Sequence, residues 1–193
     1  MSELKPLEDS VVAVLGVVRN CAKSLNREVN NIRVSLRKAK RVHWLIVESD
    51  STDSTVDVLR KLRSAIQDFE YIELGMLAGS IPSRTERISY CRNKYIEEIR
   101  NNAVYEKVDF VVVADLDGAN DQLTAQAIES CWNRGGWDMC AANQSAPYYD
   151  VWALRHESWN PSDCWDLFKF LEKYSTDREQ NKITAIYSRM IQI

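Results

Sequence analysis

The 193-residue sequence contains little glycine and little proline, with six residues of the first and four of the second. It has no Pro/Gly-rich linker, no low-complexity tract and no internal repeat, so nothing in it marks a boundary between domains. We therefore expect a single domain over residues 1–193, a length that suits one sizeable hydrophobic core.

Long apolar runs are also missing. No stretch reaches the roughly 20 residues that a membrane-spanning helix needs, and the first residues lack the basic-then-apolar pattern of a secretory signal. The five cysteines are scattered and form no C-x-x-C pair, which favours reduced thiols over a structural zinc site. These absences predict a cytoplasmic protein with no transmembrane segment.

The sequence has no excess of positive charge. Its 25 Lys and Arg residues stand against 28 Asp and Glu, giving a formal net charge of -3. General nucleic-acid binders are usually basic, so nucleic acid is not an expected partner. Local arginines can still bind a small ligand that carries phosphate.

What the sequence does contain is an alternation of strand and helix patterns. Apolar strands are expected at 11–18, 42–47, 71–74 and 110–114, with further short strands at 137–142 and 149–154. Helices are expected at about 22–40, 56–66, 83–102 and 122–133. Repeated βα units of this kind predict an α/β fold with one doubly wound, mostly parallel sheet flanked by helices.

Two carboxylates follow the fourth expected strand. Asp115-Leu116-Asp117 comes directly after the apolar run 110–114, which is typical of a buried parallel strand. Residues two apart project to the same side of a strand. Open α/β sheets bind ligands at the carboxyl ends of their strands, and two like charges there are costly unless a cation or hydrogen-bond donors neutralise them. The pattern therefore predicts that Asp115 and Asp117 bind a divalent cation.

Two other interpretations of this segment stay open. Aspartates often do no more than end a strand and cap a turn. Asp-Leu-Asp-Gly also looks like the nucleophile motif of haloacid-dehalogenase-type phosphohydrolases, in which the first Asp attacks phosphorus and the second is the acid/base. That motif normally lies on the first strand and is followed by Thr, whereas here Ala119 follows and several βα units come before.

Asp115-Leu116-Asp117 also resembles the D-x-D motif of nucleotide-sugar glycosyltransferases of the GT-A fold. Residues 47–55, which read V-E-S-D-S-T-D-S-T, resemble the V-D-D-G-S-T-D-G-T stretch of the family-2-like members. This resemblance implies that Glu48 contacts the nucleoside, with Arg19 and Asn20 at the neighbouring strand edge. Ser49 and Asp50 stand where the family has Asp and Gly.

Two arginines open the third expected helix. Arg84 and Arg87 are three residues apart, so they share a face of its first turn. Basic side chains at a helix N-terminus are unfavourable unless an anion is bound there, and a guanidinium can bind a diphosphate through two hydrogen bonds. The alternative is a solvated basic face that pairs with nearby glutamates. Together with Arg92-Asn93 and the D-x-D segment, the pattern resembles fungal capsule-associated and Golgi mannosyltransferases.

The resemblance implies a glycosyltransferase that moves a sugar from a UDP- or GDP-sugar to an acceptor hydroxyl, assisted by Mn²⁺ or Mg²⁺. An inverting enzyme would need a general base, for which Asp150 is the candidate. Members of the family usually continue beyond the equivalent of Ile193, so we expect a truncated or minimal form. A non-catalytic nucleotide-binding module of the same fold is the alternative. The donor base, the sugar and the acceptor are left open.

Overall fold

The computed structural model of the chain describes residues 4–133 and 135–141. The chain divides into two compact units, Met1–Asp138 and Met139–Ile193. The predicted strand at 149–154 and the candidate base Asp150 lie outside the described residues. The prediction of one domain over 1–193 stays a prediction.

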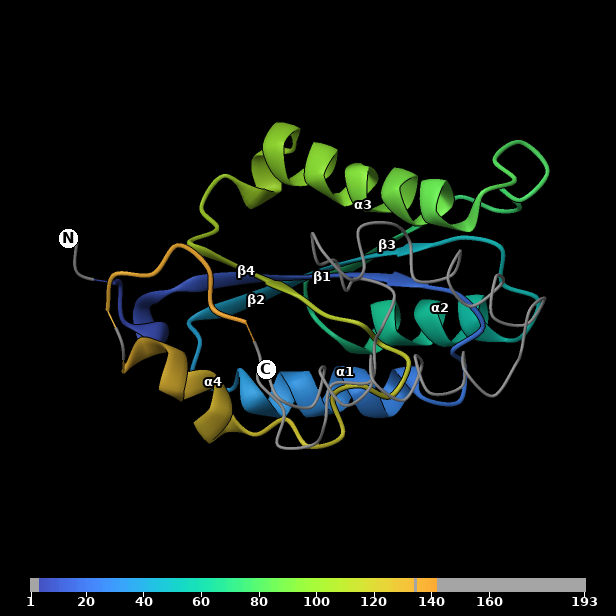
Figure 1. Ribbon diagram of the computed structural model, residues 1–193. Coiled ribbons are helices and arrows are strands. Elements are labelled where there is room, and N and C mark those ends of the chain that lie inside the picture. Colours follow the sequence, from blue (N-terminus) through green and yellow to red (C-terminus); the bar gives the residue numbers. More distant parts are fainter. Residues whose placement is uncertain (1–3, 134, 142–193) are drawn as a thin grey trace, which may run out of the picture. The chain divides into compact units, whose positions relative to one another are not determined.

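Four parallel strands form one sheet in the order β3-β2-β1-β4 (Figure 1). The strands are β1 (Val11–Val18), β2 (Arg41–Glu48), β3 (Phe69–Glu73) and β4 (Phe110–Val113). The helices are α1 (Leu25–Ser35), α2 (Thr55–Ala65), α3 (Arg84–Asn101) and α4 (Ala125–Trp132), with short 3-10 turns at Leu7–Asp9 and Ala103–Tyr105. The predicted α/β fold with a parallel sheet flanked by helices is confirmed.

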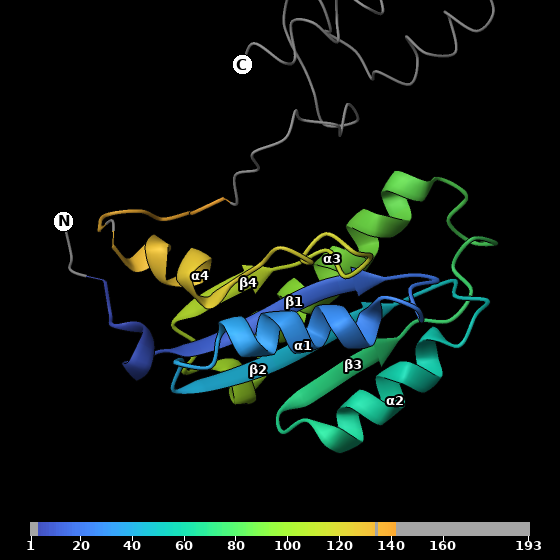
Figure 2. The same cartoon turned by 90° about the horizontal axis from the view of Figure 1, so that it is seen from below.

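Helices cover both faces of this sheet. Helices α1, α2 and α4 lie on one side and α3 on the other (Figure 1), and Figure 2 shows α1 crossing in front of β1 and β2. Alternate residues of β1 supply the two cores: Val12 and Val14 pack with α1 and α2, whereas Ala13 and Leu15 pack with α3. Right-handed connections between parallel strands explain this arrangement. The chain crosses the sheet in one direction from β1 to β3 and in the opposite direction from β3 to β4. The helix of the return connection, α3, therefore lies on the opposite face.

This path creates a topological switch point between β1 and β4. The connection from β1 leads to β2 on one side, while β4 pairs with β1 on the other side, in register from Val12 with Phe110 to Leu15 with Val113. Ligands of open α/β sheets bind outside the carboxyl ends of the strands at such a point. The segments that follow β1 and β4 therefore lie where a ligand of this kind of sheet would bind.

Two expectations about the later strands are wrong. The run 110–114 was expected to be fully buried, but Val111 and Val113 are 47% and 60% exposed. The reason is that β4 ends the sheet of the described residues, and α3 packs against β1 and β2 instead. No strand forms over the described residues 137–141, where Gly135 and Gly136 precede an irregular segment.

Candidate functional site

The loops that follow β1 and β2 are joined by hydrogen bonds. Arg19 Nε donates to the carbonyl of Asp50 at 3.2 Å, the Asn20 N–H donates to Ser51 Oγ at 3.0 Å, and Asn20 Oδ1 accepts from the Thr52 N–H at 2.7 Å. Asn20 has a φ of 51°, a left-handed conformation that Asn adopts more readily than most residues. The structure thus places Arg19 and Asn20 beside the loop that begins at Glu48; their binding of a nucleotide stays a prediction.

The N-cap residue of α2, Ser54, makes no side-chain cap hydrogen bond, but its neighbour Asp53 accepts hydrogen bonds at the start of the helix. Asp53 Oδ1 accepts hydrogen bonds from the Thr55 N–H at 3.0 Å and from the Thr55 hydroxyl at 2.5 Å. These bonds, the hydroxyl bond first, lower the pKa of the Asp53 carboxyl. Asp53 Oδ2 also accepts from the Ala22 N–H at 3.2 Å, and Thr55 Oγ1 accepts from the Cys21 N–H at 2.9 Å. Asp53 therefore joins the two loops and also accepts from the N–H of Thr55, the first residue of α2.

Glu48, the predicted nucleoside contact, is the last residue of β2 and is only 2% exposed. Its Oε1 accepts a hydrogen bond from the Ser51 N–H at 2.9 Å. One carboxylate oxygen therefore closes the turn at the end of the strand. The side chain lies at the carboxyl edge of the sheet, as its place in the sequence predicts.

Asp50 and Arg87 hold the β3–α3 loop against the end of β2. Asp50 is 1% exposed, its Oδ1 accepts from the Ala78 N–H at 2.8 Å, and its Oδ2 lies 3.3 Å from Arg87 Nε. Arg87 Nη1 also donates to the carbonyls of Ile81 and Pro82, both at 2.7 Å. Asp50 has a φ of 58°, the left-handed conformation that favours the glycine found there in the stretch it resembles.

The two arginines predicted to bind a diphosphate therefore differ in their surroundings. Arg87 is largely buried in the contacts just described. Arg84 is exposed and makes no hydrogen bond or ion pair with another described residue. Ser83 caps α3 by accepting from the Glu86 N–H at 3.4 Å. Arg84 is thus the guanidinium with the freer side chain at this helix end.

Asp115 and Asp117 follow β4 at the switch point, and both side chains are exposed. Within the described part of the chain, neither carboxylate is engaged in a hydrogen bond or an ion pair. Burial raises the pKa of Tyr95 in α3; the charge of Arg92 opposes this rise and that of Asp115 adds to it. The acidic pair therefore has two available carboxylates, and that of Asp115 is near enough to α3 to act on Tyr95.

The residue between the two acids anchors them. Leu116 is 1% exposed and belongs to the core on the α1 and α2 side. Gly16 of β1 provides the space: a Cβ there would lie 3.0 Å from the Ala114 carbonyl oxygen and 3.1 Å from Leu116 Cδ1. Close approach of β1 thus allows Leu116 to enter the core, while its two neighbours stay in solvent.

Polar side chains of α1 and of its N-cap residue, Ser24, hold the segment after β4, residues 115–120, which we call the acidic loop. Ser24 Oγ donates to the Leu116 carbonyl at 3.1 Å, and Asn31 Nδ2 donates to the Asn120 carbonyl at 3.4 Å. Between them, Glu28 Oε2 accepts from the Asn120 N–H at 2.9 Å and from Asn120 Nδ2 at 2.7 Å. The sequence analysis missed Glu28, although its helical spacing from Leu25 and Ile32 would have placed it on the buried face.

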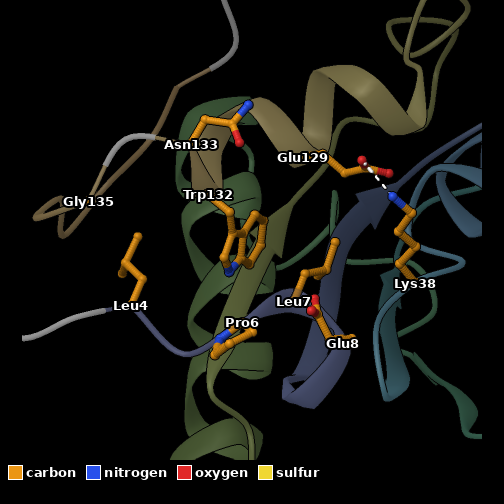
Figure 3. Close-up of a pocket in the computed structure, with 9 residues that line it drawn as sticks. All are labelled: Leu4, Pro6, Leu7, Glu8, Lys38, Glu129, Trp132, Asn133 and Gly135. Carbon is orange, nitrogen blue, oxygen red and sulfur yellow. Dashed lines mark hydrogen bonds and ion pairs between the residues drawn. The ribbon is translucent and has the colours of Figure 1, made fainter.

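A separate depression of about 500 Å³ lies near the start of β1 (Figure 3). Trp132 Nε1 donates to the Lys5 carbonyl at 3.0 Å, and Lys38 pairs with Glu129 at 2.8 Å. Its lining residues are Leu4, Pro6, Leu7, Glu8, Lys38, Glu129, Trp132, Asn133 and Gly135. No residue predicted for the ligand site lines it, so the depression is not the predicted site.

The acidic pair leaves two carboxylates available for the predicted cation. Mg²⁺ is usually bound by one or two carboxylates together with water and substrate phosphates, and Asp115 and Asp117 supply two carboxylates without other partners among the described residues. Over residues 4–133 and 135–141, no group of three or more His, Cys, Asp or Glu side chains is arranged to hold a metal ion by itself.

No helix in that part of the chain is long and apolar enough to cross a membrane.

A scan of the sequence against protein-family models finds no match, and a search of curated proteins finds none either.

Proposed function

We propose that the chain binds a nucleoside-diphosphate sugar at the carboxyl edge of its sheet and transfers the sugar to an acceptor hydroxyl. The observation that carries this proposal is the position of Asp115 and Asp117. Both exposed carboxylates follow β4 at the topological switch point, and β4 pairs with β1, which Arg19 and Asn20 follow. This is where ligands of open α/β sheets bind.

The surrounding residues supply what such a donor requires. Glu48 and Arg19 border the position proposed for the nucleoside, because the β1 and β2 loops are joined there. Arg84 is the exposed cation proposed for the diphosphate, with Arg87 behind it in the same helix turn. A bound Mn²⁺ or Mg²⁺ would neutralise the charge that develops on the departing diphosphate. Asp115 and Asp117 would hold that ion.

Titration with Mn²⁺ and nucleotides tests the proposal. UDP and GDP are titrated by calorimetry with and without Mn²⁺, using the full chain and Asp117→Asn, with Asp121→Asn as the matched control. Asp121 is an exposed acid of the following segment that pairs with Arg27 at 2.8 Å. Asp117→Asn should lose Mn²⁺-dependent nucleotide binding, whereas Asp121→Asn should keep it. Affinity that survives Asp117→Asn would contradict the assignment of the metal site.

Turnover separates the alternatives. Release of UDP or GDP from the matching sugar nucleotide, dependent on an acceptor, supports a transferase. Metal-dependent binding without turnover under all acceptor conditions identifies a nucleotide-binding module. Release of phosphate from simple phosphoesters would instead favour the phosphohydrolase interpretation of Asp115-Leu116-Asp117.

A further inference from the structure

Glu28 is a fully buried carboxylate beneath the acidic loop. Its side chain is 0% exposed, and its Oε2 accepts two hydrogen bonds from Asn120, one from the backbone and one from the side chain. Asn120 Nδ2 also donates to the carbonyl of Asp115. A continuous set of hydrogen bonds therefore runs from α1 through Asn120 to the first acid of the pair.

Stability of the fold does not explain a carboxylate at this position. Glu28 Oε1 has no hydrogen-bond partner among the described residues, and no described Lys or Arg forms an ion pair with Glu28. A buried polar oxygen without a hydrogen-bond partner costs about 1–3 kcal/mol. Glu28 lies on the helix face that carries Leu25, Val29 and Ile32, where an apolar side chain would avoid that cost.

The backbone that carries the two acids is held at adjacent carbonyl groups. Asn120 binds the Asp115 carbonyl, and Ser24 Oγ binds the Leu116 carbonyl at 3.1 Å. These contacts fix the peptide groups on both sides of Leu116, so the side chains of Asp115 and Asp117 start from a fixed backbone. Ligand groups that are held in place before binding lose less entropy when they bind an ion.

We propose that Glu28 is a positioning residue, which holds the acidic loop so that Asp115 and Asp117 can bind one cation together. The effect of Glu28 on cation binding rests on the proposed function, whereas its role in holding the acidic loop does not. Residues behind metal ligands typically change metal affinity by about 10–100-fold when they are mutated. Glu28 reaches the acidic pair through Asn120 and touches neither acid's carboxylate.

The test compares Glu28→Ala, Glu28→Gln and Asn120→Ala in the full chain. Arg27→Ala is the matched control, because Arg27 is the neighbouring residue of α1 and its side chain forms an exposed ion pair with Asp121, next to the same loop. Amide hydrogen exchange of residues 115–121 is measured by mass spectrometry, and the affinity for Mn²⁺ alone is measured by electron paramagnetic resonance. The Gln side chain can accept both Asn120 hydrogen bonds, so it should restore what Ala loses.

We expect Glu28→Ala and Asn120→Ala to speed exchange in the acidic loop at least about tenfold, and to weaken Mn²⁺ binding about tenfold or more. Glu28→Gln and Arg27→Ala should stay within about threefold of the unmodified chain by both measurements. Equal damage by Gln and Ala would overturn the inference, as would faster exchange spread evenly over β1 and α1. If the unmodified chain binds no Mn²⁺ while exchange follows the expected pattern, the proposed function fails and the positioning role is supported.

Discussion

Replacing Gly16 by alanine should destabilise the fold at the point where Leu116 enters the core. The added Cβ would lie 3.0 Å from the Ala114 carbonyl oxygen, 3.1 Å from Leu116 Cδ1 and 3.4 Å from Ile46 Cδ1. The first contact is with backbone, which cannot turn aside as a flexible side chain can. Overpacking of this kind typically costs about 1–3 kcal/mol.

A smaller opposing effect comes from the unfolded chain. Alanine restricts the unfolded backbone more than glycine does, which is worth about 0.4–1 kcal/mol where the native conformation accepts it. Gly16 has no positive φ, so it would receive this gain. The expected net change for Gly16→Ala is therefore a loss of about 1–2 kcal/mol in the free energy of unfolding, measured by urea denaturation.

Gly79→Ala is the matched control, because a Cβ at Gly79 would have no heavy atom within 4 Å. This variant should be neutral or stabilised by up to about 1 kcal/mol. Leu116→Ala alone should cost about 2–5 kcal/mol. The double variant should cost less than the sum, since the atom that crowds the new Cβ is gone. Equal effects of the two glycine variants, or additivity within about 0.5 kcal/mol, would refute the proposed contact between Gly16 and Leu116.

Three further predictions follow from buried groups elsewhere in the described structure. Burial lowers the pKa of His43 below its ordinary 6.5, the nearby charge of Arg41 adding to this. Below pH 6.5 the unfolded chain therefore binds more protons than the folded chain, and the free energy of unfolding should decrease as the pH is lowered. In His43→Phe this decrease should be less steep. Equal slopes for the two proteins in urea denaturation at pH 5–7.5 would contradict this. Burial raises the pKa of the Cys21 thiol to about 11. Iodoacetamide at pH 8 should therefore alkylate Cys21 at least about 100-fold more slowly in the folded than in the unfolded chain. The rates are measured by peptide mass spectrometry, and equal rates would contradict this prediction. Asp50→Asn should keep the left-handed turn but remove the charge that faces Arg87. This should lower the free energy of unfolding by about 1–3 kcal/mol and speed hydrogen exchange in residues 75–82. Unchanged exchange in these residues would show that the ion pair does not anchor this loop.

Much of the fold was predictable from periodicity. The expected strand at 11–18 matches β1, and the strands expected at 42–47 and 71–74 overlap β2 and β3. These strands are apolar because helices cover both faces of the sheet. Burial on both faces requires an apolar side chain at successive positions, and such a run is visible in the sequence. The exposure of Val111 and Val113 was not predictable, because it depends on which strand ends the sheet.

For the candidate site too, some features could be predicted from the sequence and others could not. Glu48 ends β2, and Asp115 and Asp117 follow β4, as the apolar runs before them predict. The contact of Arg87 with Asp50 and that of Glu28 with Asn120 join residues 37 and 92 positions apart. Such pairings depend on how loops meet in three dimensions, which spacing along one chain does not encode. The binding roles of the predicted residues stay predictions until ligands are tested.

The hydrogen bonds between the β1–α1 and β2–α2 loops bear on any attempt to redesign the chain. Asn20 and Asp53 each bond across the boundary between these loops, so a graft that replaces one loop leaves the other with unpaired backbone groups. An engineer who wishes to replace either loop should transplant residues 19–22 and 49–55 as a pair. Libraries that randomise both segments together should yield folded variants with new sequences more often than libraries that randomise either one alone.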